Sequence, residues 1–506
     1  MSLNRRLIVS VCAAASGLAV AAEPNPNPNP WLADSPWPMT HSQPGAPDSS
    51  VYPGPQSAAQ LGAPQYVATG YINITQAMSP QYPDGNRVYW GSNISDVYKL
   101  AVVNGKLKKL ASLAKPGNTL SNLGSPTSGA YTLVDKDNVF YTVRGTSLLA
   151  YKDAVAGQLD SPIVLARQLT LPASVTTSDD AVVGLNLMWD GRLAFVTRKG
   201  VAGVVNRDFT GLQTVVLGAG DEEVSNSIAA DEQGGIYIVT SKAMYRVQWT
   251  GRQLSLDEAT GAWRAEYNGG SAGTGGGRLG AGSGSTPTIM GSGEQRFVVI
   301  TDGANVANIV LFWADRIPAD WKPIAPGKSL RMAAEMPVNF GDPKRTATKS
   351  EQSVVVSGYG AVVVSNDYRN TSLLSGGTGV ALIDQAMNGA IVLMSGTTKV
   401  QPWGVQKFTW DTAARQLRSA WVNTKVSCPN AIPTVSEPSQ RFYCVGAYLG
   451  MWTIESLDWR TGGDHFRKLI GMLPRYNSFY AATQLTGDGG LIYGSFDGAV
   501  YLPAAR

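Results

Sequence analysis

The chain has 506 residues, of which 15% are charged and 43% are hydrophobic, and its formal net charge is +4. No basic stripe appears, which argues against a nucleic-acid partner, and no apolar run after residue 22 reaches the roughly 18 residues of a membrane-spanning helix. The 56 glycines and 20 tyrosines are typical of a turn-rich all-β protein.

The N-terminal residues 1–22 are expected to be a cleaved signal peptide. Arg5 and Arg6 precede an apolar stretch, and small residues follow it at 19–22, as signal peptidase requires. Export would remove both arginines and lower the net charge from +4 to +2. The mature protein is therefore expected to be soluble and either periplasmic or secreted.

Residues 23–64 are rich in proline and asparagine, beginning with PNPNPNPW after Glu23. Such a composition cannot bury a hydrophobic core, so the segment is predicted to be a disordered leader. Within it, Trp31 and Trp37 are the residues suited to docking on the folded body.

Residues 65–506 repeat one plan, in which a Gly- or Asp-marked turn is followed by two short β-branched or aromatic runs. Clear copies cover residues 85–98, 137–151, 191–205, 235–247 and 489–502, and weaker copies cover 295–312, 359–383 and 441–454. This repeat predicts one all-β domain, a single β-propeller of eight four-stranded blades, with seven blades as the alternative. The strand after Asp488 is expected to pair with a strand near 66–74 and close the ring.

Cys428 and Cys444 are the two cysteines that remain after export, 16 residues apart. Two cysteines in an exported protein most simply form one disulfide. The bond is expected to staple a proline-rich loop onto the strand around 442–445.

Polar residues next to the innermost strands are expected to converge on the propeller axis. The candidate metal ligands are Asn226, Glu351, Asn186 and Asn430, because Ca²⁺ prefers carboxylate and amide oxygens. The candidate substrate-binding residues are Thr286, Thr288 and Gln352. The alternative is that these groups bond the loops they occupy.

Histidine is scarce, with only His41 in the leader and His465 in an outer hairpin. Neither is expected to line the channel, so a Ser-His-Asp triad, a His-ligated zinc and a histidine general base are not expected.

Two turns, L-D-x-x-T-G at 256–261 and 457–462, resemble the blade motif of the quinoprotein alcohol dehydrogenase-like propellers. In that family a tryptophan after the turn docks one blade on the next; here Trp263 stands two positions early and Phe466 takes the second place. The resemblance implies that fold and, as a cofactor, pyrroloquinoline quinone (PQQ), which we rank behind calcium because the chain has no adjacent cysteine pair.

The run NSIAADEQGGIYIVT, residues 226–240, resembles one blade of the calcium-dependent lactonases and strictosidine synthase-like propellers. There, the asparagine lies at the mouth of the axial tunnel, so the resemblance implies a metal-ligating role for Asn226.

The function expected from these features is that of an exported monomeric propeller which binds a small organic molecule at its tunnel mouth and transforms it, by metal-assisted hydrolysis of the lactonase type. A quinone-dependent oxidoreductase is one alternative. A non-catalytic periplasmic binding or scaffold propeller is the other.

Overall fold

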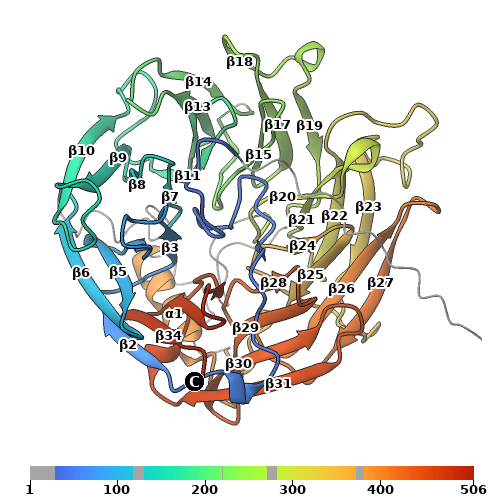
Figure 1. Cartoon of the computed structure of the whole chain (residues 1–506). Helices are drawn as coiled ribbons and strands as arrows, with labels where there is room; N and C mark the ends of the chain where they lie inside the picture. Colours follow the sequence, from blue (N-terminus) through green and yellow to red (C-terminus); the bar gives the residue numbers. More distant parts are fainter. Residues whose placement is uncertain (1–28, 118–129, 219, 271–281, 372–380, 506) are drawn as a thin grey trace, which may run out of the picture.

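The computed structural model describes residues 29–117, 130–218, 220–270, 282–371 and 381–505; the expected signal peptide lies outside them. Eight sheets stand round a central axis like the blades of a propeller (Figure 1). Each blade has four antiparallel strands in chain order from the axis outward, apart from the additions described below. The predicted all-β propeller is confirmed, with eight blades.

The first four blades follow one another along the chain. Their strands are, for blade 1, β3 (Thr75–Met78), β4 (Tyr89–Ser92), β5 (Asp96–Val103) and β6 (Lys106–Ala114); for blade 2, β7 (Leu133–Val134), β8 (Phe140–Arg144), β9 (Ser147–Asp153) and β10 (Ile163–Thr170); for blade 3, β11 (Val182–Leu187), β12 (Leu193–Thr197), β13 (Val201–Val205) and β14 (Gln213–Val216); for blade 4, β15 (Ala229–Ala230), β16 (Gly235–Val239), β17 (Ala243–Trp249) and, both on β17, β18 (Leu254–Ser255) and β19 (Trp263–Glu266).

The remaining blades use the second half of the chain and return to its beginning. Their strands are, for blade 5, β20 (Thr288–Met290), β21 (Phe297–Thr301), β22 (Asn308–Trp313) and β23 (Met332–Pro337); for blade 6, β24 (Val355–Ser357), β25 (Gly360–Val364), β26 (Val405–Asp411) and β27 (Gln416–Asn423); for blade 7, β28 (Thr434–Ser436), β29 (Arg441–Tyr448), β30 (Met451–Asp458) and β31 (Asp464–Gly471); for blade 8, β32 (Gln484–Leu485), β33 (Leu491–Gly494), β34 (Gly498–Leu502) and β2 (Gln65–Ala68).

Blade 8 is built from both ends of the chain. Its outermost strand β2 pairs antiparallel with β34, with Tyr66 opposite Val500. This is the predicted closure, in which a strand from the start of the chain completes the last blade.

The predicted hairpins are the second and third strands of their blades, joined by tight turns. The third and fourth strands of blade 1, β5 and β6, are also joined by a tight turn, in which Asn104 and Gly105 both have positive φ (53° and 74°), the backbone of a two-residue hairpin turn. The hydrophobic core lies between neighbouring blades: one cluster joins Tyr141 of blade 2 to Phe195 of blade 3.

One hairpin prediction, over 359–383, is wrong. β25 pairs not with a strand inside that range but with β26, which begins at Val405. The intervening insertion carries a helix, α1 (Ala381–Met394), made of good helix formers such as Ala, Leu, Met and Gln. Among the described residues α1 is the one α-helix; three-residue 3₁₀ turns also occur at Ala58–Gln60, Glu258–Thr260, Gly293–Gln295 and Pro474–Tyr476.

The disulfide prediction is confirmed: Cys428 and Cys444 are bonded, with Cα atoms 6.0 Å apart. Cys428 lies in the crossing between β27 and β28, and Cys444 on β29. The bond fastens the chain that enters blade 7 to the blade's second strand.

The L-D-x-x-T-G turns link a third strand to an outer one. Asp257 accepts a hydrogen bond from the Ala259 N–H (2.9 Å), and Asp458 accepts from the Arg460 and Thr461 N–H groups. After the first turn Trp263 does dock on the next blade: its Nε1 donates to the Ala314 carbonyl oxygen (2.9 Å).

The leader prediction is wrong for residues 29–64. Trp31 is half-buried and Trp37 is buried, and the short strand β1 (Ser49–Ser50) pairs in parallel with β28. Figure 1 shows this blue segment at the centre of the ring. Its proline-rich composition prevents a sheet of its own, but the inner edges of the blades supply hydrogen-bond partners for its backbone.

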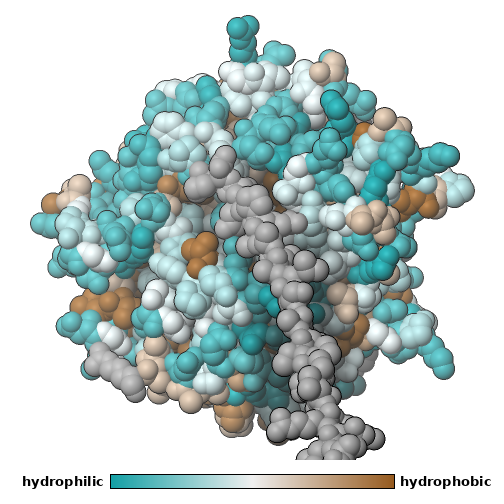
Figure 2. Space-filling model, turned by 45° about the vertical axis from the view of Figure 1, so that its right-hand side comes forward, coloured by the Kyte–Doolittle hydropathy of each residue, from teal (hydrophilic) through white to brown (hydrophobic). Residues whose placement is uncertain are grey.

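The face of the molecule that Figure 2 shows is mainly hydrophilic, with hydrophobic residues in small separate groups. Within the described part of the chain no helix is long and apolar enough to span a bilayer.

Candidate binding site on the propeller axis

Residues 40–48, here called the tip loop, run round the inside of the ring and contact one blade after another. The Thr40 N–H donates to the Thr132 carbonyl of blade 2 (3.1 Å). The carbonyls of Pro44, Gly45, Pro47 and Asp48 then accept N–H groups in turn from the inner strands of blades 4, 5, 6 and 7 (2.8, 2.8, 2.9 and 3.2 Å). The tip loop thereby pairs polar groups on inner edges that a closed ring leaves facing the axis.

The two ends of the tip loop are fastened together by a hydrogen bond between an imidazole and a carboxylate. His41 Nδ1 lies 3.0 and 3.1 Å from the two carboxylate oxygens of Asp48, and both residues are buried. Ser42, Ala46 and Asp48 have positive φ (64°, 59° and 54°), which L-residues with side chains seldom adopt. Such strain persists only where the surrounding contacts impose it.

The Asp48 carboxylate fixes the tautomer of the imidazole. When Nδ1 carries the proton and donates it to Asp48, Nε2 is left as a lone-pair acceptor. His41 Nε2 is buried and has no hydrogen-bond partner among the described residues. An acceptor in this state is suited to receive a proton from a bound molecule.

Tyr131, from the crossing between β6 and β7, lies beside His41 with ring centroids 5.8 Å apart. Burial raises the pKa of the Tyr131 hydroxyl, against the opposing effects of Thr286 and the Ser227 backbone, so it stays a hydrogen-bond donor at neutral pH. Burial also raises the pKa of Asp48, and the neighbouring His41 opposes that rise. We call His41, Asp48, Tyr131 and Thr286 the axial cluster.

Two predicted metal ligands, Asn186 and Asn430, bond to the protein through both ends of their amides. The Asn186 NH₂ donates to the Pro44 and Ile228 carbonyls, and its Oδ1 accepts the Leu187 N–H. The Asn430 NH₂ donates to the Val392 carbonyl of α1 (3.2 Å), and its Oδ1 accepts the Ser478 hydroxyl (2.7 Å). The Asn186–Ile228 contact joins blades 3 and 4, and the Asn430–Ser478 contact joins the segments that lead into blades 7 and 8.

The other two, Asn226 and Glu351, contact two adjacent residues, Ser283 and Gly284. The Asn226 NH₂ donates to the Ser283 carbonyl (2.9 Å). Glu351 lies against Gly284, where an added Cβ would stand 3.0 Å from a carboxylate oxygen. Both residues are buried at the chain crossings into blades 4 and 6.

The predicted substrate-binding residues are all buried. The Thr288 hydroxyl donates to the Ala46 carbonyl of the tip loop (3.2 Å), and Thr286 belongs to the axial cluster. Gln352 is 2% exposed, and neither of its amide atoms has a partner in the described part of the chain. Further buried hydroxyls without a described partner lie in the segments that lead into inner strands, at Thr132, Ser350, Ser427 and Thr483.

A buried polar group that stays unpaired costs about 1–3 kcal/mol. Several such groups around one axis, together with His41 Nε2, are the pattern expected where water or a small polar ligand completes the hydrogen bonding.

Within the described ranges, the candidate residues do not form a calcium- or quinone-binding set. Both side-chain ends of Asn186 and Asn430 are occupied, and no three His, Cys, Asp or Glu residues gather within the described ranges. The calcium and PQQ predictions therefore stay predictions, and no chemical step is derived through either group.

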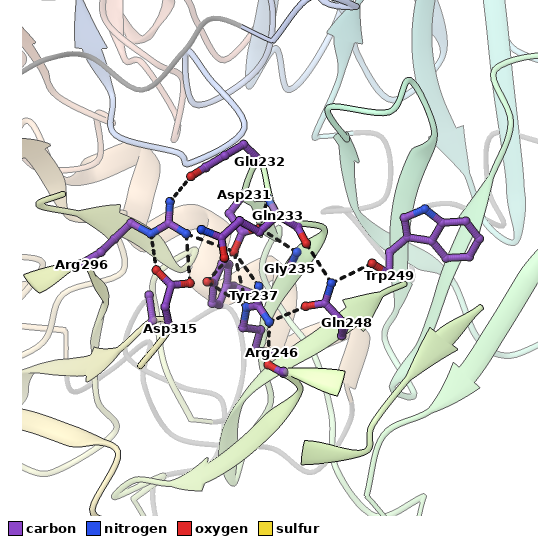
Figure 3. Close-up of polar contacts among 12 residues, drawn as sticks. Asp231, Glu232, Gln233, Gly235, Tyr237, Arg246, Gln248, Trp249, Arg296 and Asp315 are labelled. Atoms are coloured by element: carbon purple, nitrogen blue, oxygen red, sulfur yellow. Dashed lines mark hydrogen bonds and ion pairs between the residues drawn. The ribbon is translucent and has the colours of Figure 1, made fainter. Parts of the chain in front are cut away.

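Asp231, the acid of the lactonase-like run, anchors a turn (Figure 3). Its Oδ1 accepts the Gln233 and Gly235 N–H groups, and its Oδ2 accepts the Tyr237 hydroxyl (2.7 Å). Arg246 of the same blade and Arg296 of blade 5 approach the same oxygen, at 3.2 and 3.6 Å.

Blade 2 repeats this arrangement at the same spacing. Asp135 accepts the N–H groups of Asp137 and Val139 and the hydroxyl of Tyr141, and Arg207 of blade 3 pairs with it at 2.6 Å. The recurring acid therefore holds a blade turn and ties it to the next blade.

The fold defines the class of protein: an eight-bladed β-propeller. The chain is similar to quinohemoprotein alcohol dehydrogenases from Pseudomonas putida (12% identity, TM-score 0.56, 93% of this chain and 81% of that one) and Comamonas testosteroni (10%, 0.55, 94% and 82%). It is also similar to a europium-containing methanol dehydrogenase (8%, 0.52, 94% and 99%). At these identities the likeness concerns the fold alone.

In sequence the chain is 38% identical, over 475 residues, to a protein of Archaeoglobus fulgidus described as uncharacterized. The match covers 93% of this chain and 87% of that protein, so the chain belongs to the same family. No family profile matches it.

Proposed function

We propose that this exported, monomeric propeller binds a small polar organic molecule on its axis and exchanges a proton with it through His41. The carrying observation is the His41 imidazole, held at Nδ1 by Asp48 (3.0 Å) and buried with Nε2 unpartnered in the described residues. Gln352 and Tyr131 are further groups with which a ligand would bond. The disulfide is compatible with export.

The reaction class that suits this arrangement is hydrolysis of an ester or lactone. His41 Nε2 would take a proton from a water molecule, whose oxygen then bonds to the carbonyl carbon. The proton would pass to the departing alkoxide as its carbon–oxygen bond breaks. Calcium held near Asn226 and Glu351 stays part of the proposal, and no step above depends on it.

A quinone-dependent oxidoreductase is the second candidate, supported by the likeness of the whole chain to quinohemoprotein alcohol dehydrogenases. A non-catalytic binding propeller would share the ligand site and lack turnover.

Native mass spectrometry of protein purified from its own host distinguishes these candidates. The variants are His41→Gln and the matched control His465→Gln, which changes the half-buried histidine of β31. Wild type and the control are expected to carry a small organic molecule that denaturation releases, and His41→Gln is expected to retain at least about tenfold less of it, the loss of one buried hydrogen bond.

A retained mass equal to that of a quinone would favour the oxidoreductase. An axial site is contradicted if wild type retains nothing and no hydroxy acid, lactone or sugar raises its melting temperature more than that of His41→Gln. Ester or lactone turnover that His41→Gln leaves unchanged would contradict the role of His41.

A further inference from the structure

A second group of reactive side chains lies between blades 1 and 2, apart from the axial cluster. Lys115, just after β6, has its Nζ 3.0 Å from the Ser92 hydroxyl at the end of β4. Thr142 of β8 donates its hydroxyl to the same Ser92 oxygen (3.3 Å). All three residues are buried.

Lys115 has no carboxylate within ion-pair distance in the described part of the chain. Lys99 of the neighbouring strand β5 is buried too, but its Nζ lies 2.5 Å from Asp153. A buried ammonium without a counter-charge is disfavoured relative to the neutral amine. Burial, helped by the nearby charge of Arg144, lowers the pKa of Lys115 to about 7.

A neutral lysine amine within hydrogen-bond distance of a serine hydroxyl can act as its base. The amine accepts the hydroxyl proton, while the Thr142 hydroxyl, which donates to the same oxygen, stabilises the charge that develops there. The structure supplies a nucleophile, a base at 3.0 Å and a third group that orients the nucleophile.

We propose that Ser92 and Lys115 form a nucleophile–base pair that accepts an acyl group from a small activated ester. Ser92 Oγ bonds to the acyl carbon as its proton passes to Lys115 Nζ. The bond from that carbon to the leaving oxygen breaks, and the leaving group takes the proton from Lys115. A water molecule then gives a proton to Lys115 Nζ as its oxygen bonds to the acyl carbon. The bond from that carbon to Ser92 Oγ breaks, Oγ takes the proton from Lys115, and the carboxylic acid is released.

The test is acetylation of the folded, full-length mature protein by p-nitrophenyl acetate, with the acetyl group located by peptide mass mapping. Wild type is expected to be acetylated at Ser92, with a rate that rises as the pH passes about 7. Lys115→Met is expected to lower the rate at Ser92 by about 100-fold, the usual contribution of a positioned base.

The matched control is Lys407→Met. Lys407 is also buried, but its Nζ donates to the Trp459 carbonyl (2.8 Å) and lies 4.1 Å from the centroid of the Trp459 indole ring. Its substitution should leave Ser92 acetylation unchanged.

A measurement on wild type alone guards against misfolding of Lys115→Met. In competitive labelling with limiting acetic anhydride at pH 7.5, Lys115 should react at least about tenfold faster than ion-paired Lys99. The proposal is overturned if folded wild type neither carries acetyl on Ser92 nor releases p-nitrophenolate faster than Lys115→Met does. It is also overturned if folded Lys115→Met acetylates Ser92 at the wild-type rate, or if Lys115 reacts no faster than Lys99.

Discussion

At the scale of single residues, the Asp48 carboxylate closes the tip loop by holding His41 at 3.0 Å. The contact is buried on both sides, so solvent does not screen it. It also keeps Asp48 itself in a left-handed backbone conformation, with φ of 54°. One side chain thus both orients the imidazole and sustains the shape of the loop that carries it.

Asp48→Asn keeps the size of the side chain but removes its charge. Because a buried charge-assisted hydrogen bond contributes about 1.5–3 kcal/mol, the free energy of unfolding at pH 7 should fall by about 2 kcal/mol. Urea unfolding checks this, with Asp84→Asn as the control, since Asp84 lies in an exposed turn. A midpoint for Asp48→Asn equal to that of wild type would show that the pair does not fasten the tip loop.

At the scale of elements, the hairpins were predictable and the tip loop was not. A hairpin has a local sequence signal, namely alternating apolar and polar residues and turn residues such as Asn104–Gly105. Its strands can therefore be placed without knowledge of the rest of the chain. The tip loop reads THSQPGAPD and has no pattern of its own. Its conformation comes from the inner edges of seven blades, which no local signal reveals.

The candidate site divides in the same way. Thr286, Gln352, Asn226 and Glu351 could be predicted because they stand just before inner strands. His41 could not, since its position in a proline-rich leader argued against any buried role. Helix α1 was not predicted for a different reason: it lies in an insertion between β25 and β26, and the blade repeat predicts consecutive strands there.

The β15–β16 turn is the element where charge joins two blades (Figure 3). Burial tends to raise the pKa of Asp231, but Arg246, Tyr237 and the Gly235 N–H outweigh it, so the pKa lies below its ordinary value. A lowered carboxyl pKa stabilises the folded state above the unfolded-state pKa of about 4, and that stabilisation is lost as the pH falls through the folded-state value.

Asp231→Asn should therefore lower the free energy of unfolding by about 3 kcal/mol at pH 7, because Arg246 and Arg296 lose a buried partner. The difference from wild type should shrink as the pH falls below about 4. Glu232→Gln is the control: Glu232 pairs with Arg296 at 2.5 Å on the rim, and its removal should cost about 0.5 kcal/mol. Equal losses for the two variants, or a deficit independent of pH, would contradict this account.

At the scale of the whole molecule, the N-terminal segment closes the propeller twice. β2 completes blade 8 on the outside, and residues 29–50 fill the axis on the inside, with hydrogen bonds to seven of the eight blades. The N-terminal segment thus acts at two radii: β2 completes the outer edge of blade 8, and residues 29–50 bond to inner parts of blades 1 to 7. The same inner segment carries His41 and Asp48, so the stability of the ring and the candidate binding site depend on one stretch of chain.

The most direct test of this central claim compares two mature chains by differential scanning calorimetry, one starting at residue 29 and one at residue 51. Both retain β2, so both can complete blade 8. The chain from residue 29 should have the same melting temperature as the full-length mature protein. The chain from residue 51 should have a melting temperature at least about 10 °C lower, or fail to fold, because its inner strands lose their axial partners. Equal melting temperatures for the two chains would show that residues 29–50 do not hold the blades together.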